Sequence, residues 1–424
     1  MSIIELGEVR DEPAAVPSTR RPRAVGRPSR GAAVLVLALV VLAGATPVPQ
    51  RTVHVVPASP RATTYLAGDS VFVVDPPTPD GDRYLTAYAQ PTANGTVRRR
   101  WQAPLARHGD YLGVRVERGL VLAMEVAAPN RLFQTAAYDA VTGQQRWRQP
   151  GATQSTVDGG LLLTNVREDG SSTMSRVQPD SGQLLWSMPI PSPANPSYHL
   201  VEGRVDQFVL LEPTGEVRVH DAGTGRLLRS VDTLSGDRAA FQRMQVVDDL
   251  LLLVPPGSAR LVGYGLAELE PLWTVEVPLV AYAVSCAGLL CAIPETGGLQ
   301  VLDPTSGVLR WSDRSQDAVV GVRHGRLLMA KPGRGYTARD AATGQNRVEL
   351  GEWVLTPLLR PDDPLVGMRR GDNGRLTVAE LDLVAGRARV VDVLPGIAGS
   401  CQASLPVLLC QRVDGTTALW RLAR

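Results

Sequence analysis

The sequence predicts an all-β protein, a β-propeller of four-stranded blades, that follows one N-terminal transmembrane helix. Three observations lead to this prediction. A short pattern ending in tryptophan recurs at a spacing of about 42 residues, with pairs of short apolar runs between its copies. No amphipathic pattern of helical length occurs after residue 60. A single uncharged segment, residues 31–50, precedes the repeats.

Residues 31–50 have the length of a membrane-spanning helix. No charge occurs between Arg30 and Arg51, and a helix of that length spans about 30 Å, the thickness of a bilayer core. Five arginines lie between positions 20 and 30, so the positive-inside rule keeps residues 1–30 in the cytoplasm. We expect a disordered basic tail at 1–30, an uncleaved signal-anchor at 31–50 and an extracytoplasmic body. Cleavage after Ala45 is the alternative.

The charge balance argues against a nucleic-acid partner. The chain has 44 basic and 42 acidic residues, a formal net charge of +2, and residues 1–30 carry six arginines and four carboxylates. The rest of the chain is therefore balanced and lacks the dense basic run that neutralises phosphates. Lys331 is the only lysine, which is typical of the codon usage of a high-GC genome.

The four cysteines form two local pairs. Cys286 and Cys291 bracket one short turn, and Cys401 and Cys410 bracket another. Local pairing is the simplest of the three connectivities that four cysteines allow, so we expect two disulfides that staple hairpins in an oxidising compartment. The five histidines are scattered singly, so no metal site is expected.

The recurring pattern predicts a β-hairpin. An aspartate follows a short strand and can accept hydrogen bonds from the amides after it, and a glycine four positions later supplies the positive φ that closes the turn. A tryptophan or a substitute follows in the returning strand, where its ring can cover the seam between neighbouring sheets. The turn residues are Asp139, Gly143, Gly182, Asp221, Gly225, Asp303, Gly307, Asp340, Gly344, Asp382 and Gly386, and the tryptophans are Trp101, Trp147, Trp186, Trp273 and Trp311.

The ends of the chain predict a closed ring. Residues 87–101 and 263–273 are weaker copies of the pattern, the first with an insertion and the second without the glycine. The chain ends with three strands and no fourth, and a lone strand lies in the linker 51–60 before the propeller domain 61–424. Eight blades is the preferred count. Nine follow if the lone strand completes the last blade, and seven is the remaining alternative.

The repeat resembles the pyrroloquinoline-quinone-like (PQQ-like) propeller repeat. The best matches are residues 138–147, 178–186 and 303–311, and the resemblance covers nearly all of 60–424. WD40 repeats have a similar period but end in a Trp-Asp dipeptide, which does not occur in this sequence. The resemblance implies a fold shared by quinone-dependent dehydrogenases, a lipoprotein scaffold of outer-membrane protein assembly and other exported proteins.

The resemblance does not imply an enzyme site. Dehydrogenases with this repeat stack their quinone on a disulfide between adjacent cysteines and hold calcium with carboxylate and amide ligands. No two cysteines are adjacent in this chain, and Asp80, Asp82, Asp372 and Asn373 lie in segments expected to be solvated turns. We therefore expect no catalytic residue, no cofactor and no metal ligand.

These observations favour a membrane-anchored, exported propeller that binds a protein or a cell-envelope polymer without catalysis. Insertions at 75–82, 167–172 and 189–198 are candidate contact loops, although the last, which is proline-rich, also fits a plain connector. A PQQ-dependent dehydrogenase is one alternative, and an extracytoplasmic ligand sensor is another.

Overall fold

A computed structural model describes Leu35 and most of residues 51–422. The gaps lie at 92–94, 108, 128–131, 168, 191–195, 234–242, 256–258, 332, 334, 346, 357–362 and 373. The chain divides into two units, Met1–Gln50 and Arg51–Arg424. No helix among the described residues is long and apolar enough to cross a membrane. The expected anchor at 31–50 falls outside those residues, except for Leu35.

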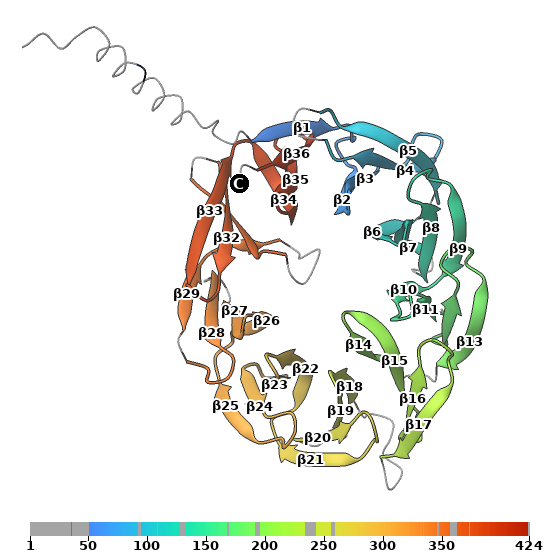
Figure 1. The fold of residues 1–424 in the computed structure, drawn as a ribbon, viewed down its shortest axis with the longest axis vertical. Coiled ribbons are helices and arrows are strands. Elements are labelled where there is room, and N and C mark those ends of the chain that lie inside the picture. The colour runs from blue at the N-terminus through green and yellow to red at the C-terminus, as the bar shows by residue number, and fades with distance from the viewer. Residues whose placement is uncertain are drawn as a thin grey trace, which may run out of the picture. The chain divides into compact units, whose positions relative to one another are not determined.

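The second unit is a ring of nine four-stranded antiparallel sheets (Figure 1). Each sheet is a meander whose first strand lies nearest the centre of the ring and whose fourth forms the outer wall. We number the sheets as blades in chain order. Blades 1 to 3 are β2 (Thr63–Ala67), β3 (Ser70–Val74), β4 (Arg83–Ala89) and β5 (Arg98–Leu105); β6 (Asp110–Glu117), β7 (Leu120–Ala127), β8 (Leu132–Asp139) and β9 (Gln145–Pro150); and β10 (Ala152–Ser155), β11 (Leu161–Val166), β12 (Ser172–Val177) and β13 (Leu184–Ile190).

The remaining blades follow the same order. Blades 4 to 6 are β14 (Ser197–Val201), β15 (Arg204–Leu211), β16 (Glu216–Asp221) and β17 (Leu227–Asp232); β18 (Arg243–Val247), β19 (Leu250–Val254), β20 (Arg260–Gly265) and β21 (Pro271–Glu276); and β22 (Val280–Cys286), β23 (Leu289–Pro294), β24 (Leu299–Leu302) and β25 (Leu309–Asp313). Blades 7 to 9 are β26 (Ala318–Arg323), β27 (Arg326–Lys331), β28 (Gly335–Asp340) and β29 (Val348–Gly351); β30 (Val354–Leu355), β31 (Val366–Arg370), β32 (Leu376–Asp382) and β33 (Arg387–Leu394); and β34 (Ile397–Ser404), β35 (Val407–Arg412), β36 (Thr417–Arg421) and β1 (Thr52–Val56).

The ring closes with strands from both ends of the chain. β1 pairs antiparallel with β36, and Thr52 lies opposite Arg421. The lone N-terminal strand therefore completes blade 9, whose other three strands come from the C-terminal end. The blade count is nine and not the preferred eight. The weak copies at 87–101 and 263–273 each belong to a complete blade of their own, so they count as two separate blades.

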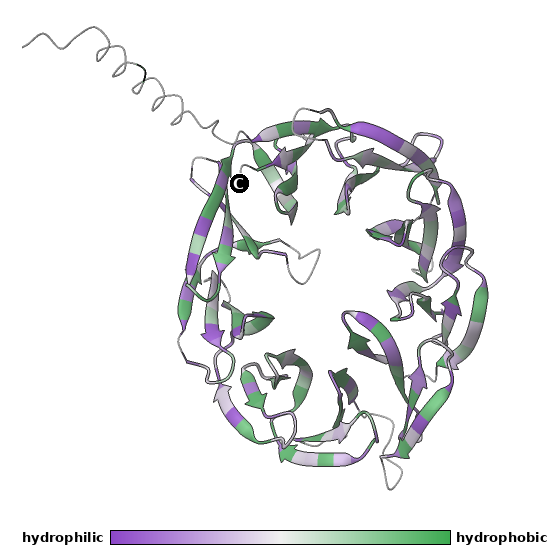
Figure 2. Cartoon of the chain, viewed as in Figure 1, coloured by the Kyte–Doolittle hydropathy of each residue, from purple (hydrophilic) through white to green (hydrophobic). Residues whose placement is uncertain are grey.

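The apolar core of the described residues consists of nine clusters, and each joins two neighbouring blades. The cluster that seals the ring packs Val56 and Leu419 of blade 9 against Val71 and Val73 of blade 1. Figure 2 shows hydrophilic and hydrophobic residues alternating along the outer strands, as expected for strands with one face on solvent. Burial between blades, rather than within one sheet, therefore stabilises the ring.

The repeat turns join the third and fourth strands of their blades. In blade 2, Oδ1 of Asp139 accepts hydrogen bonds from the amides of Val141 (3.0 Å) and Thr142 (2.8 Å). The glycine that closes the turn, Gly143, has φ of +72°. The other repeat turns have the same two features. The aspartates that accept hydrogen bonds from amides two or three residues later are Asp221, Asp303, Asp340 and Asp382. The glycines with φ between +65° and +71° are Gly182, Gly225, Gly307, Gly344 and Gly386.

The turn glycine also receives the tryptophan of the preceding blade. A Cβ on Gly143 would lie 2.5 Å from Cδ2 of Trp101, and Nε1 of Trp101 donates a hydrogen bond to the carbonyl of Ala140 (2.9 Å). One glycine thus closes a turn within its blade and makes room for the side chain that joins the neighbouring blade. The other pairs of this kind are Trp147 with Gly182, Trp186 with Gly225, Trp273 with Gly307 and Trp311 with Gly344.

The turn aspartates predict a loss of stability in acid. Hydrogen bonds from Thr305 and Arg310 lower the pKa of Asp303 far below its ordinary value. Because the unfolded pKa is higher, near 3.9, the stabilisation is complete above about pH 5 and is lost as the pH falls toward the folded pKa. Asp303→Asn keeps an acceptor oxygen but has no charge to lose. Urea unfolding at about pH 7 and about pH 3 should therefore show a smaller acid-induced loss in the variant than in the wild type. Equal losses would contradict a contribution from this carboxylate.

Candidate functional site

The clearest candidate site lies where the repeat departs from its own pattern. In blade 5, Gly265 occupies the position of the turn aspartate, and Leu269 occupies that of the glycine with φ of +55°. The preceding blade has Arg229 in place of the tryptophan, and Nε of Arg229 donates to the carbonyl of Leu266 (2.9 Å). A ring of the tryptophan type would meet the Cβ of Leu269, so the two substitutions belong together.

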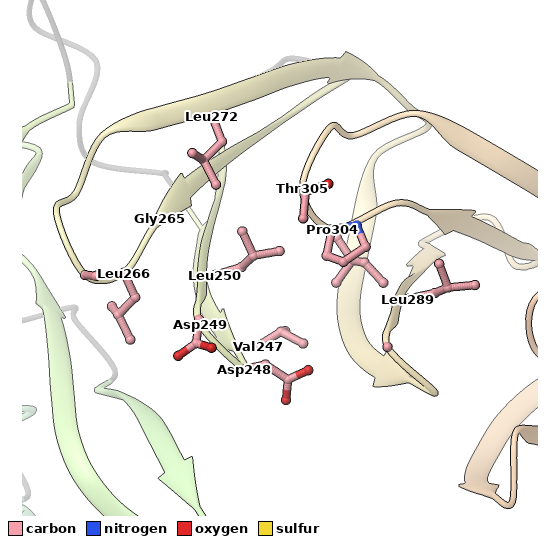
Figure 3. Close-up of a pocket in the computed structure, with 13 residues that line it drawn as sticks. Val247, Asp248, Asp249, Leu250, Gly265, Leu266, Leu272, Leu289, Pro304 and Thr305 are labelled. Carbon is pink, nitrogen blue, oxygen red and sulfur yellow. The ribbon is translucent and has the colours of Figure 1, made fainter.

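Beside this turn, a pocket of about 510 Å³ opens between blades 5 and 6 (Figure 3). Four hairpin tips form its walls, two from each blade, and all four lie on the face of the ring that carries the repeat turns. We call this face the turn face and the hollow the leucine pocket. The leucine pocket is lined by Val247, Asp248, Asp249, Leu250, Gly265, Leu266, Ala267, Leu272, Gly288, Leu289, Leu290, Pro304 and Thr305.

The walls of the leucine pocket are apolar and are held in place from several sides. Leu250, Leu266 and Leu290 are buried, whereas the side chain of Leu272 is half exposed at the mouth. The amide of Leu266 donates to the carbonyl of Asp249 (2.9 Å), which ties the two tips of blade 5 together. Nε1 of Trp273 donates to the carbonyl of Pro304 (2.8 Å), which ties blade 5 to blade 6. The pocket is thus preformed, as small binding sites usually are.

A disulfide braces the blade 6 side of the pocket. Cys286 and Cys291 are bonded and bracket the tip that contributes Gly288, Leu289 and Leu290. The second disulfide joins Cys401 to Cys410, which lie opposite each other in β34 and β35 of the closing blade. All four cysteines are buried.

The edge of the leucine pocket is acidic. Asp248 and Asp249 form the tip between β18 and β19, and Figure 3 shows both carboxylates at the edge of the hollow. His199 of blade 4 lies between Asp206 (Nδ1 to Oδ1, 2.5 Å) and Asp249 (Nε2 to Oδ1, 3.3 Å). The side chain of Asp249 nevertheless remains 95% exposed, so this contact leaves it open to a partner.

The same sector of the ring carries leucines on its outer wall. The residue just before the tryptophan position is leucine in blades 3, 4 and 5, namely Leu185, Leu228 and Leu272. In the other blades with this repeat it is arginine, paired with a carboxylate, at Arg100, Arg146, Arg310, Arg347 and Arg389. In blades 2 and 6 the carboxylate is that of the turn aspartate, and in blades 3 and 5 this aspartate is replaced, by Gln178 and by Gly265.

The loops singled out from the sequence lie elsewhere. Residues 75–82 and 167–172 join second to third strands, and 189–198 includes the connection from β13 to β14. The described residues of these segments are at the end of the blades opposite the turn face, since strand direction alternates in a meander, whereas residues 168 and 191–195 lie outside the described part of the chain. Asp82 forms an ion pair with Arg107 (3.0 Å). The leucine pocket was not anticipated, although the missing glycine in the copy at 263–273 marked its place.

The residues present do not fit the quinone site of PQQ-dependent dehydrogenases. The resemblance implies a disulfide between adjacent cysteines for such a site, whereas the two disulfides here join buried cysteines that are five and nine residues apart. Among the described residues, no three histidine, cysteine, aspartate or glutamate side chains are grouped to hold a metal ion. What the leucine pocket offers chemically is apolar contact with an acidic edge.

Comparisons with known proteins found one sequence family and several solved structures. Residues 81–274 match the sequence family described as "Outer membrane protein assembly factor BamB". No curated protein sequence matches significantly. Similar solved structures include the computationally designed Ika8 protein (17% identity, TM-score 0.47, 74% of this chain and 96% of that one). BamB from Moraxella catarrhalis is another (13%, TM-score 0.39, 87% and 98%). A third is quinohemoprotein alcohol dehydrogenase ADHIIG from Pseudomonas putida HK5 (13%, TM-score 0.41, 71% and 68%).

The repeat and the family match point to the same relationship. The matched residues contain the full strand, aspartate, glycine and tryptophan pattern in blade 2 and partial copies in blades 3 and 4, where Gln178 replaces the aspartate and Arg229 the tryptophan. Related copies follow in blades 6, 7 and 8. Nine sheets built on this repeat close into one ring. The chain is thus a β-propeller with a PQQ-like repeat, and residues 81–274 are similar to that family.

Proposed function

We propose that the protein is a membrane-anchored, exported propeller that binds a protein or another cell-envelope partner through the leucine pocket, without catalysis. The observation that carries this proposal is the pocket itself. An apolar hollow of about 510 Å³ with one polar edge is typical of a site that takes up a ligand or a partner side chain. Leu272 lies at the mouth and is half exposed. Contact of this apolar side chain with water is unfavourable, and a bound partner would remove that contact.

The outer-wall leucines extend this surface beyond the pocket. Leu185 and its neighbour Leu184 on blade 3 are 49% and 57% exposed, and Leu227 on blade 4 is 45% exposed, whereas Leu228 is partly buried against the core. Leu272 belongs both to this exposed surface and to the pocket. Exposed apolar residues that gather in one sector mark interaction surfaces more often than single ones do. The family description, an assembly factor, supports a scaffold role for this chain as well.

The anchoring and export in this proposal rest on the sequence. The arginines at positions 20 to 30 and the apolar residues 31–50 favour a helix with its N-terminus in the cytoplasm. Two disulfides and no free cysteine among the four suit an oxidising compartment. In intact protoplasts, added protease should therefore remove a tag fused at Arg424 while a cytosolic protein stays whole. A protected tag would contradict export.

Crosslinking in the native membrane tests the binding role. The full-length tagged chain is compared with the double variant Leu272→Gln/Leu289→Gln, which changes one half-exposed and one partly buried side chain of the pocket lining. Loss of two apolar contacts corresponds to about 2–3 kcal/mol, so the amount of crosslinked partner should fall at least about tenfold. The measurement is quantitative mass spectrometry of proteins that co-purify after crosslinking.

A matched control separates the pocket from general surface effects. Val141→Gln/Val413→Gln changes two apolar side chains that are 81% and 70% exposed, in blades 2 and 9, and should leave the crosslinked partner unchanged. Equal capture by the wild type and both double variants would place the partner elsewhere. Equal loss in both would show a nonspecific effect and would also contradict the proposal.

A further inference from the structure

We propose that the partner presents a cationic segment to the leucine pocket, with one apolar side chain inserted between arginine or lysine residues. This inference rests on the proposed binding function and names the chemistry of the partner. It starts from the two halves of the site, an apolar hollow and an acidic edge that belong to the same hairpin tips.

The charged side chains on the four hairpin tips that form the pocket are all acidic. The tips of blade 5 contribute Asp248, Asp249, Glu268 and Glu270, all exposed, and the four tips that form the pocket contain no arginine, lysine or histidine. Asp303, at the start of the fourth tip, is already paired with Arg310. Within the described part of the chain, no ion pair is made by Asp248, Glu268 or Glu270.

This acidity is local and does not reflect the charge of the whole propeller. Outside residues 1–30 the chain has equal numbers of basic and acidic residues. A hollow of similar volume, about 510 Å³, lies between blades 7 and 8, and its lining has both signs of charge: Arg323, Arg387 and Arg389 together with Glu380 and Asp382. The two hollows therefore differ, because the charged side chains that line the leucine pocket are carboxylates alone.

Electrostatic complementarity decides which partner such a site selects. Single exposed ion pairs contribute little affinity, but several carboxylates of one sign accelerate association with a cationic partner and disfavour an acidic one. Burial of one hydrophobic side chain between the apolar walls then stabilises the complex. A basic segment with a leucine, isoleucine or aromatic residue satisfies both halves. An acyl chain or a neutral polymer would leave the acidic edge unmatched.

Selection from an unbiased peptide library tests this inference. A displayed library of random peptides is selected on the immobilised full-length protein in detergent, with counter-selection on Leu272→Gln/Leu289→Gln. We expect enriched peptides to carry a large apolar residue flanked by arginine or lysine. They should bind the double variant about tenfold more weakly, and their affinity for the wild type should fall as salt is raised.

Neutralising the acidic edge gives the second arm. The triple variant Asp248→Asn/Glu268→Gln/Glu270→Gln should weaken binding of the selected peptides about tenfold and abolish most of the salt dependence. The control triple variant Asp80→Asn/Glu352→Gln/Asp372→Asn removes the same charge from exposed residues on the opposite face, and should bind like the wild type.

The outcomes distinguish the inference from the function on which it rests. Pocket-dependent peptides without a basic preference, or cationic peptides that bind both triple variants equally, would overturn the cationic partner and leave the binding role intact. A selection that returns no peptide sensitive to Leu272→Gln/Leu289→Gln would contradict both. Enrichment of acidic peptides would contradict the assignment of charge.

Discussion

Replacing Gly143 by alanine is expected to lower the free energy of unfolding by about 3 kcal/mol, because two separate costs add. The residue has φ of +72°, where a side chain costs about 1 kcal/mol. The new Cβ would also lie 2.5 Å from the ring of Trp101, so the indole that joins blade 1 to blade 2 must move. Urea unfolding followed by tryptophan fluorescence measures the loss.

A second glycine of the same blade separates these two costs. Gly119 has φ of +78°, and a Cβ built on it would meet nothing within 4 Å. Gly119→Ala should therefore lose only the backbone part, about 1 kcal/mol. In a Trp101→Ala background, Gly143→Ala should cost no more than Gly119→Ala, since the clash is gone. An equal loss of unfolding free energy for the two glycine variants in the wild-type background would refute the proposed contact between Gly143 and the ring of Trp101.

Introducing a carboxylate at Val56 is expected to open the ring at its closure. Val56 is 1% exposed and lies in the cluster between blades 9 and 1, so Val56→Asp should cost about 4 kcal/mol by placing a charge in an apolar interface. Val55, the next residue of β1, is 53% exposed. Val55→Asp should change stability by less than about 0.5 kcal/mol, because it leaves the interface intact.

Hydrogen exchange locates the effect of this change. In Val56→Asp, amides of β36 and β2, on either side of the closure, should exchange faster than those of blades 4 and 5 across the ring. The same amides should be unaffected in Val55→Asp. Uniform acceleration around the ring would mean that the propeller unfolds as a whole and that the closure is not a separate weak point.

The pattern that recurs in the sequence was sufficient for the type of fold because it is local. An aspartate, the amides that follow it and a glycine with positive φ lie within a few residues of one another, so their chemistry can be interpreted in any single copy. A strand without a partner at the N-terminus and a missing fourth strand at the C-terminus similarly pointed to closure. These features needed no knowledge of how the blades pack.

Contacts between distant residues decided the rest. The number of blades depends on whether Thr52 pairs with Arg421, and the sequence alone left that pairing open. The leucine pocket draws its walls from four hairpin tips in two blades, so no contiguous motif contains it. Even the turn glycine had a second role, since the ring against Gly143 belongs to the blade before it. Burial between blades depends on how neighbouring sheets pack in the closed ring, and the sequence of a single repeat does not specify that packing.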